Sequence, residues 1–301
     1  MSHASQIAGM LIVLSLAAAV VPVSGQADRP PTTAEIVAQA GPADWRSLDP
    51  ENTLYLELPA GRVIVELAPL FAPNHVAHIK ALARRGFYDG LTIYRVQENY
   101  VVQGGDADET RQPKDATRFI KAEFTRKGPG GLAFTPLPDV DGYAPQTGFS
   151  GGFPAARDPR TDTTWLVHCP GAFAMPRDND PDSGGSDFYV VIGHAPRHLD
   201  RNTTVFGRVV GGMPLLSTLR RGTGAMGFYE KPDERQPITS VRVAADVPEG
   251  QRDRLELLRT DSQSFKNLIE ARRNRREEWF HTPAGHVEVC NVPVPVRERP
   301  Q

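Results

Sequence analysis

The stretch TIYRVQENYVVQGGD, residues 92–106, has for most of its length the composition of a buried β-strand. Arg95 lies in it between Tyr94 and Val96, with apolar residues on both sides. A guanidinium is always charged, and burying it without a partner is costly. Either Arg95 points to solvent from an edge strand, or it is held at a mostly apolar surface for a purpose. The rest of the sequence has to decide between the two.

The overall composition is that of a globular protein. The chain has 301 residues, of which 40% are hydrophobic and 23% are charged. Its formal net charge of -2 argues against a nucleic-acid partner, because a phosphate-binding surface usually appears as a basic excess. Glycine and proline occur 27 times each, which predicts many loops, few helices and a β-rich fold.

The N-terminus has the pattern of an export signal. An apolar run from Ile7 to Val21 is followed by a short stretch of small and polar residues, with cleavage expected near Gly25 or Ala27. The run is slightly short for a full membrane span, although an uncleaved anchor is the alternative. We therefore expect residues 1–25 to be a signal peptide, the mature protein to be periplasmic, and no stable membrane span to remain after cleavage.

Two cysteines are present, Cys169 and Cys290. In an oxidising compartment they would pair and attach the C-terminal tail to the main body. Two separate buried thiols are the alternative, and the sequence leaves both open.

The first part of the chain consists of a polar extension followed by a predicted hairpin and a predicted helix. Residues 26–50 form a polar, Pro-rich N-terminal extension with a possible short helix at 33–40. Two alternating runs around Pro59-Ala60-Gly61 predict a β-hairpin, and the segment after Pro73 has the apolar spacing of an amphipathic helix that lies over a sheet.

The remainder predicts one main domain with two additions. Residues 51–247 form the domain, interrupted at about 126–164 by a segment rich in Gly, Pro and Asp that we expect to be a long loop. Residues 248–301 are expected to form a C-terminal helical extension and tail, with Leu255, Leu258 and Phe265 on one apolar side of an amphipathic helix, either continuous or interrupted.

Three tempting motifs lack the context that they need. GFSGG, residues 148–152, fits a serine hydrolase pattern at Ser150, but that pattern needs a strand before the serine and a helix after it. DNDPDSG, residues 178–184, lacks the terminal glutamate of a calcium loop. His75 and His78 have no further ligand pattern, so no metal site is expected.

Four motifs in order carry a family resemblance. FYDGLTIYRVQENYVVQGGD, GAFAMPR, GSDFYVVIG and HLDRNTTVFGRVVGGM together resemble the cyclophilin-type peptidyl-prolyl cis-trans isomerases, above all bacterial, exported members. The resemblance covers about residues 52–247 outside the insertion. It implies a mainly β fold, an eight-stranded antiparallel barrel capped by two helices, with the active site on its outer face.

The resemblance also implies roles for individual residues. Arg95 matches the catalytic arginine and Gln103 a glutamine that hydrogen-bonds the substrate backbone. The positions expected to bind substrate are Tyr100, Val101, Pro176, Arg177, Asp187, Phe188, His198, Leu199 and Thr203. Tyr100, Val101, Phe188 and Leu199 among them would form the apolar wall around the proline ring, although Tyr100, Val101 and Phe188 could equally belong to the barrel core.

Several positions depart from the family pattern. Asp187 stands in place of a glutamine, His198 in place of an aromatic residue, Thr203 in place of a histidine or aromatic residue, and Pro176 in place of an alanine. These changes predict a more polar pocket. Because Arg95 and Gln103 are retained, we expect an enzyme that isomerises X–Pro bonds in exported polypeptides, without cofactor and as a monomer. A cyclophilin-fold peptide-binding or scaffold module with little turnover is the alternative.

Overall fold

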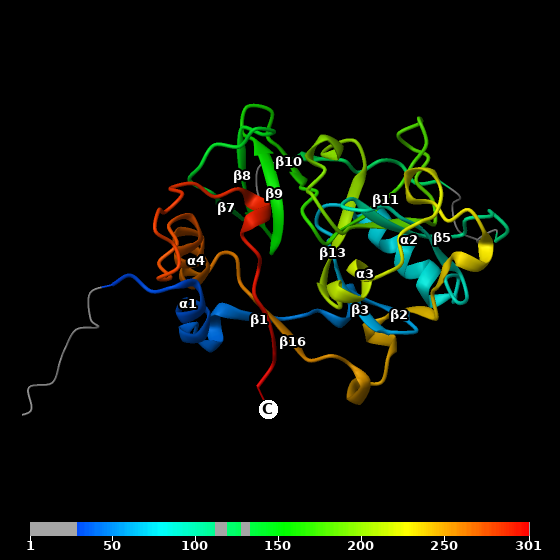
Figure 1. Cartoon of the computed structure of the whole chain (residues 1–301), viewed down its shortest axis with the longest axis horizontal. Coiled ribbons are helices and arrows are strands. Elements are labelled where there is room, and N and C mark those ends of the chain that lie inside the picture. The colour runs from blue at the N-terminus through cyan, green and yellow to red at the C-terminus, as the bar shows by residue number, and fades with distance from the viewer. Residues whose placement is uncertain (1–28, 112–118, 128–132, 301) are drawn as a thin grey trace, which may run out of the picture.

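The computed structural model describes residues 29–111, 119–127 and 133–300, so the expected signal peptide lies outside the described residues. Within that part of the chain, a barrel and a second layer of sheet and helix lie side by side (Figure 1).

The barrel is one antiparallel sheet. Its strands follow the order β14-β4-β5-β12-β11-β13-β3-β2-β15. Their bounds are β2 (Thr53–Leu58), β3 (Gly61–Leu67), β4 (Thr92–Val96), β5 (Val101–Gly105), β11 (Ala172–Met175), β12 (Phe188–Val191), β13 (Thr204–Gly211), β14 (Gln236–Pro237) and β15 (Ser240–Val243). The expected hairpin is confirmed as β2 and β3, joined at Pro59-Ala60.

The sheet closes through its last segment. β14 pairs with β4 at one edge and β15 with β2 at the other. Between them the Ile238 amide donates to the Leu91 carbonyl and the Thr239 amide to the Glu57 carbonyl, each at 2.8 Å. One stretch of chain therefore bonds both edges, and the expected eight strands are obtained when β14 and β15 are counted as one interrupted strand.

The barrel interior is apolar and covered by two helices. α2 (Pro73–Arg84) begins with a proline at its first turn and buries Val76, Ile79 and Leu82 over the sheet. α3 (Met213–Ser217) packs near β3. The mainly β cyclophilin-like barrel with two capping helices is thus confirmed. The buried interior includes Leu54, Val63, Tyr88, Ile93, Val102, Phe173, Phe188, Val190 and Phe206.

The second layer, called here the outer module, consists of residues 29–48, 126–127, 133–169 and 255–298. Its strands are β1 (Trp45–Ser47), β6 (Arg126–Lys127), β7 (Phe134–Pro136), β8 (Gln146–Ser150), β9 (Phe153–Asp158), β10 (Thr163–Leu166), β16 (Leu255–Leu258) and β17 (Val296–Glu298), and its helices are α1 (Thr33–Gln39) and α4 (Gln263–Arg273). The short helix expected at 33–40 is confirmed as α1.

Short 3₁₀ turns connect these elements. They are Pro42–Asp44, Pro50–Asn52, Arg197–Leu199, Ala225–Gly227, Pro232–Glu234, Ala244–Asp246, Glu249–Gln251 and Val289–Asn291.

The prediction of a long loop at 126–164 is wrong. Its described residues form most of a five-stranded antiparallel sheet in the order β6-β10-β9-β8-β7. Glycine and proline interrupt the apolar alternation by which a strand is recognised in a sequence. At one position the structure requires the glycine. A Cβ at Gly148 would lie 2.2 Å from the Thr135 carbonyl oxygen, so the close approach of β7 and β8 requires glycine. Ser150 ends β8 and another strand follows it, which excludes the strand–serine–helix elbow of a hydrolase at this position.

The extent of the C-terminal helix is a second correction. Leu255 and Leu258 belong to strand β16, which pairs with β1 and β17. The helix begins after Ser262, whose hydroxyl accepts from the Phe265 amide, and ends at Arg273. Tertiary pairing with β1 overrides the apolar spacing that suggested one longer helix.

The outer module and the barrel share buried contacts. Phe153, Ala155 and Leu166 of the module pack with Phe71, Val101, Ala172, Ala174, Tyr189, Val191 and Val205 of the barrel. Cys169 and Cys290 form a disulfide, which resolves the alternatives left open by the sequence. No helix among the described residues is long and apolar enough to cross a membrane.

Candidate active site

The backbone register places Arg95 and Gln103 side by side. Arg95 of β4 lies directly opposite Gln103 of β5, and Gln103 lies opposite Tyr189 of β12. The register shifts between Ile93 and Arg95, so Tyr94 is an extra residue of a β-bulge. The bulge explains how the neighbours Tyr94 and Arg95 both come to interact with Gln103.

The guanidinium of Arg95 is held by uncharged oxygen acceptors. Its Nε donates to the Met226 carbonyl at 2.8 Å, and its two terminal nitrogens donate to the side-chain oxygens of Gln103 at 3.2 Å and of Gln97 at 2.5 Å. The Phe228 ring lies 5.1 Å from the guanidinium carbon. Burial lowers the pKa of Arg95 from its ordinary value. Arg95 is half-buried and, within the described residues, forms no ion pair with a carboxylate.

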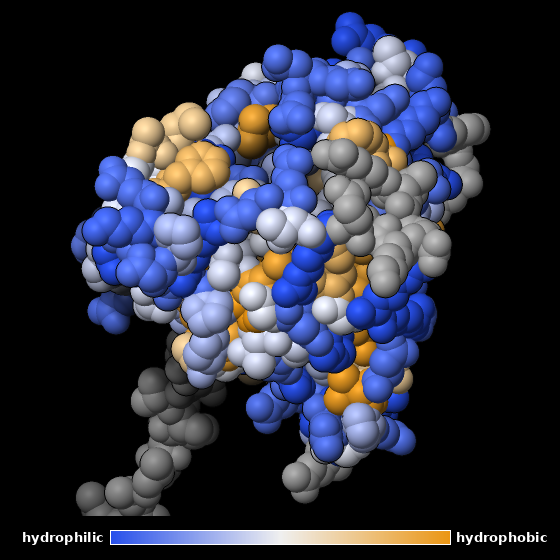
Figure 2. Space-filling model, turned by 90° about the vertical axis from the view of Figure 1, so that its right-hand side faces the viewer, coloured by the Kyte–Doolittle hydropathy of each residue, from blue (hydrophilic) through white to orange (hydrophobic). Residues whose placement is uncertain are grey.

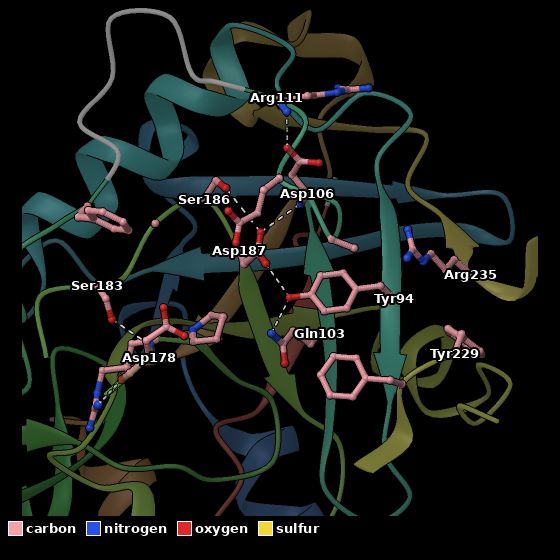
Figure 3. Close-up of a pocket in the computed structure, with 17 residues that line it drawn as sticks. Tyr94, Gln103, Asp106, Arg111, Asp178, Ser183, Ser186, Asp187, Tyr229 and Arg235 are labelled. Carbon is pink, nitrogen blue, oxygen red and sulfur yellow. Dashed lines mark hydrogen bonds between the residues drawn. The ribbon is translucent and has the colours of Figure 1, made fainter. Parts of the chain in front are cut away.

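A chain of hydrogen bonds fixes Gln103 behind Arg95. Its amide nitrogen donates to the Tyr94 hydroxyl at 2.5 Å, and that hydroxyl donates to Asp187 at 2.6 Å (Figure 3). The second oxygen of Asp187 accepts from the Asp106 amide at 3.0 Å. Because the Gln103 nitrogen is engaged, its side-chain oxygen is the atom left to face Arg95. Burial raises the pKa of Asp187, and burial beside Asp187 raises the pKa of Tyr94 well above the ordinary tyrosine value.

A cavity of about 420 Å³ opens beside this chain. Figure 3 shows Tyr94, Gln103 and Asp187 on one side of it and Asp178 with Ser183 on another. Pro176 and Arg177, both expected to bind substrate, also line it. Arg177 is fixed there, since its Nε donates to the Asn202 carbonyl at 2.6 Å and a terminal nitrogen donates to the Asp178 carbonyl at 2.6 Å. Asp178 and Ser183 belong to the exposed acidic loop that the sequence suggested.

Next to the cavity lies an apolar wall. Val101 and Gln103 alternate with Val102 along β5 and therefore share one face of the sheet. Tyr100, Val101 and Leu199 belong to one apolar cluster with Tyr189, and Thr203 contacts the Tyr189 hydroxyl at 2.5 Å. Four residues expected at the substrate, Tyr100, Val101, Leu199 and Thr203, are thus brought together.

Phe188 belongs to the barrel core, the alternative that the sequence left open, and not to the apolar wall. It is buried in the barrel interior, with its ring 5.1 Å from that of Phe173, and so lies on the opposite face of the sheet from Gln103. Tyr189, one residue later, occupies the outer face. Strand alternation accounts for the difference, because Tyr189 pairs with Gln103 and Phe188 with Gly104. His198 is exposed in the 3₁₀ turn Arg197–Leu199, next to Leu199.

Three further residues complete the site: Tyr94, Tyr189 and Phe228. Tyr94 bridges Gln103 and Asp187, and its ring stacks 6.1 Å from Phe228. Successive residues of GSDFYVVIG point to opposite faces of the sheet. If the face of any one of them had been known, alternation would have indicated that Tyr189 lies on the outer face with Gln103. Phe228 comes from a glycine-rich turn far along the chain, and no sequence signal links it to Arg95. Figure 2 shows hydrophobic surface on the face turned to the viewer, partly between hydrophilic residues and partly standing out at the upper left.

Comparisons with known proteins agree with this geometry. The family model "Cyclophilin type peptidyl-prolyl cis-trans isomerase/CLD" matches residues 53–243. A probable peptidyl-prolyl cis-trans isomerase of Brucella suis is 32% identical over 200 residues, which cover 66% of this chain and 86% of that protein. The human peptidyl-prolyl cis-trans isomerase-like 1 is 27% identical over 215 residues, which cover 71% of this chain and 100% of that protein.

The likeness extends to a solved structure. The crystal structure of cyclophilin AquaCyp293 from Hirschia baltica matches with a TM-score of 0.69 and 30% identity, covering 88% of this chain and 97% of that one. This share is larger than residues 53–243, so the similarity in fold includes part of the outer module.

The fold and site are therefore those of a prolyl isomerase. The chain belongs to the cyclophilin-type peptidyl-prolyl cis-trans isomerase family, and its enzymatic activity is the cis-trans isomerisation of prolyl peptide bonds.

Proposed function

We propose that Arg95 catalyses the isomerisation by donating a hydrogen bond to the prolyl nitrogen of a bound polypeptide. The observation that carries this proposal is the set of three uncharged acceptors, Met226, Gln97 and Gln103, which orient the guanidinium without neutralising its charge. A guanidinium has five N–H donors, so three such contacts leave two for a substrate.

The chemistry follows from amide resonance. Rotation about a peptide bond is opposed by a barrier of roughly 18–20 kcal/mol, since the nitrogen lone pair is delocalised into the carbonyl. Uncatalysed X–Pro exchange takes on the order of tens of seconds. In the twisted state the lone pair is localised on nitrogen and accepts a hydrogen bond from Arg95. An interaction made mainly in the transition state raises the rate.

The neighbouring residues position the substrate. Gln103 is held by Tyr94 and keeps its side-chain oxygen beside Arg95. The wall formed by Val101, Tyr189 and Leu199 accepts the proline ring, and Pro176 with Arg177 borders the cavity that accepts the preceding residues.

Arg95→Ala tests this mechanism. Isomerisation of a peptide with one Ala–Pro bond should slow by a factor of roughly 10² or more, while the circular dichroism spectrum and the unfolding midpoint stay unchanged. Arg95→Lys is the matched control, because it keeps a charge but loses the planar fork, and its rate should fall between the other two. Equal rates for wild type and Arg95→Ala would contradict the mechanism.

We propose further that the substrates are exported polypeptides and that the protein acts in the periplasm. The apolar run from Ile7 to Val21 and the paired cysteines, which suit an oxidising compartment, support this location. Intact-mass analysis of protein from the periplasmic fraction should find a chain that begins near Gln26 or Asp28. A full-length chain in that fraction would contradict cleavage.

A further inference from the structure

A buried histidine of the outer module lies directly behind the apolar wall of the site. His168 follows β10, precedes the disulfide-bonded Cys169, and has no exposed surface. Its ring lies parallel to that of Tyr189, with the ring centres 6.2 Å apart. The residue therefore joins the outer module to the wall of the site.

One side of the imidazole is fixed by a carboxylate. Its Nδ1 lies 2.9 Å from an oxygen of Asp200, and the backbone amide of His168 donates to the same oxygen at 3.0 Å. The other oxygen of Asp200 accepts from Nε of Arg197 at 2.7 Å. Asp200 in this ion pair is a carboxylate and can only accept, so Nδ1 of His168 carries the hydrogen and the ring orientation is set.

The other side of the imidazole engages both hydroxyls of the wall. Nε2 lies 2.9 Å from the Tyr189 hydroxyl and 3.0 Å from the Thr203 hydroxyl, and the two hydroxyls are 2.5 Å apart. In the tautomer with its hydrogen on Nδ1, the ring offers Nε2 as an acceptor, so one hydroxyl can donate to it and the other hydroxyl can donate to the first. Both hydroxyl hydrogens are then used within this triangle.

We propose that His168 is a positioning residue of the isomerase site, which rests on the proposed function. It holds the hydroxyls of Tyr189 and Thr203 behind the wall, so that the carbon surface of the wall meets the proline ring. Unpaired hydroxyls at an apolar surface are costly, and a proline ring has no group to pair with them.

This role reverses one expectation from the sequence. Thr203 and its neighbours predicted a more polar pocket. The structure instead supplies an internal acceptor for the hydroxyls of Tyr189 and Thr203, and that acceptor comes from the outer module rather than from the barrel. The outer module thereby contributes to substrate binding without contacting the substrate.

The test replaces His168 in two backgrounds. In the wild-type background, His168→Phe leaves the hydroxyls of Tyr189 and Thr203 without their acceptor, and KM for the Ala–Pro peptide should rise by about tenfold, with kcat changed much less. In the background Tyr189→Phe/Thr203→Val the hydroxyls are absent, so the same replacement should change KM by less than about twofold.

His75→Phe is the matched control. His75 is also buried and also bonded to a carboxylate, with Nδ1 2.7 Å from Glu123, but it lies on α2 and its ring packs against Phe206 of the barrel interior. It should lower stability without changing KM. An equal KM rise for His168→Phe in both backgrounds, or a fall in kcat at constant KM, would overturn the positioning role.

Binding separates this inference from the catalytic proposal. The dissociation constant of the same peptide, measured by NMR titration, should rise about tenfold in His168→Phe whether or not Arg95→Ala abolishes turnover. Unchanged affinity in His168→Phe would refute the role of His168 alone. Unchanged turnover in Arg95→Ala would refute the catalytic mechanism alone.

Discussion

The hairpins of the barrel and the terminal segments of the outer module are held together by different kinds of contact. In the barrel, β2 pairs with β3 and β4 with β5, which are neighbours in sequence, although β15 returns from far along the chain to pair with β2. In the outer module, β1 pairs with β16 across more than two hundred residues, and α1 packs on α4. Local pairing can be recognised from a short stretch of sequence, whereas long-range pairing depends on the whole chain.

The tryptophans distinguish the two regions experimentally. The chain has three, and all of them belong to the outer module: Trp45 and Trp165 are buried, and Trp279 is exposed. Tryptophan fluorescence therefore reports on the outer module, while isomerase activity reports on the barrel. The predictions below use these two signals to test whether the regions unfold separately.

The largest effect is expected from removing a core phenylalanine in each region. Phe265 of the module and Phe206 of the barrel have no exposed surface, and each forms an edge-to-face contact at 4.8 Å, with Phe149 and Phe173 respectively. Replacing either by alanine should cost about 4 kcal/mol. Phe265→Ala should lower the urea midpoint of fluorescence more than that of activity, and Phe206→Ala should lower both.

If the fluorescence and activity transitions coincided in both variants, the separate unfolding of the two regions would be contradicted. They would show that the barrel and the outer module unfold as one cooperative unit.

A smaller loss is expected at the joint between the regions. Arg197 of the barrel is buried and pairs with Asp141 of the module at 2.9 Å and with Asp200 at 2.7 Å. Arg197→Met leaves the buried carboxylates of Asp141 and Asp200 without their cationic partner. The free energy of unfolding, measured with urea at pH 7, should fall by about 3 kcal/mol. Arg242→Met is the control, because its bond to Asp89 at 2.6 Å is half-exposed and should be worth less than about 1 kcal/mol.

The same pair gives a pH dependence with a defined sign. Burial tends to raise the pKa of Asp141, but the hydrogen bonds and charge of Arg197, together with the backbone amides of Tyr143 and Ala144, lower it below the ordinary value. A lowered pKa contributes stability above the unfolded value of about 4, and that stability is lost as the pH falls through the folded value. The stability difference between wild type and Arg197→Met should therefore shrink from pH 7 to pH 3. A constant difference would show that Asp141 does not couple to Arg197.

The smallest effect is expected at the start of α1. The Thr32 side chain accepts from the Glu35 amide, and the Glu35 side chain accepts from the Thr32 amide, a reciprocal capping box. Thr32→Ala should cost about 1 kcal/mol in the fluorescence transition and leave the activity transition unchanged. Thr239→Ala, at an exposed barrel position, should change neither transition by more than about 0.5 kcal/mol.

The sequence predicted the barrel well because its pattern is local. Alternation marked β2 and β3, helical spacing marked α2, and the motif around Arg95 placed the site. The prediction for the wall missed by one residue, because alternation alone does not tell whether Phe188 or Tyr189 points to the outer face of the sheet. The bulge at Tyr94 could not be foreseen, because a shift in register belongs to a pair of strands and not to one of them.

The outer module could not be predicted for the converse reason. Pairs such as Leu258 with Trp45 join segments that carry no mutual signal. Its strands are short and contain glycine or proline, as Gly148 and Pro154 show, so they lack the alternation that identified the hairpin. The positioning role proposed for His168 depends on the same long-range assembly, which brings β10 behind the site.

The position of β17 has a consequence for the order of events during synthesis. Val296–Glu298 is the last strand among the described residues, and it completes the small sheet β1-β16-β17 whose first strand is made more than two hundred residues earlier. While the chain is still being translated, β1 lacks its strand partner β16 and α1 lacks α4, because both partners are made after the barrel. The barrel sheet, whose last strand ends at Val243, is complete well before that point. A polypeptide that terminates early would therefore carry an assembled barrel with unpaired apolar segments, a state that chaperones and proteases distinguish from the finished product.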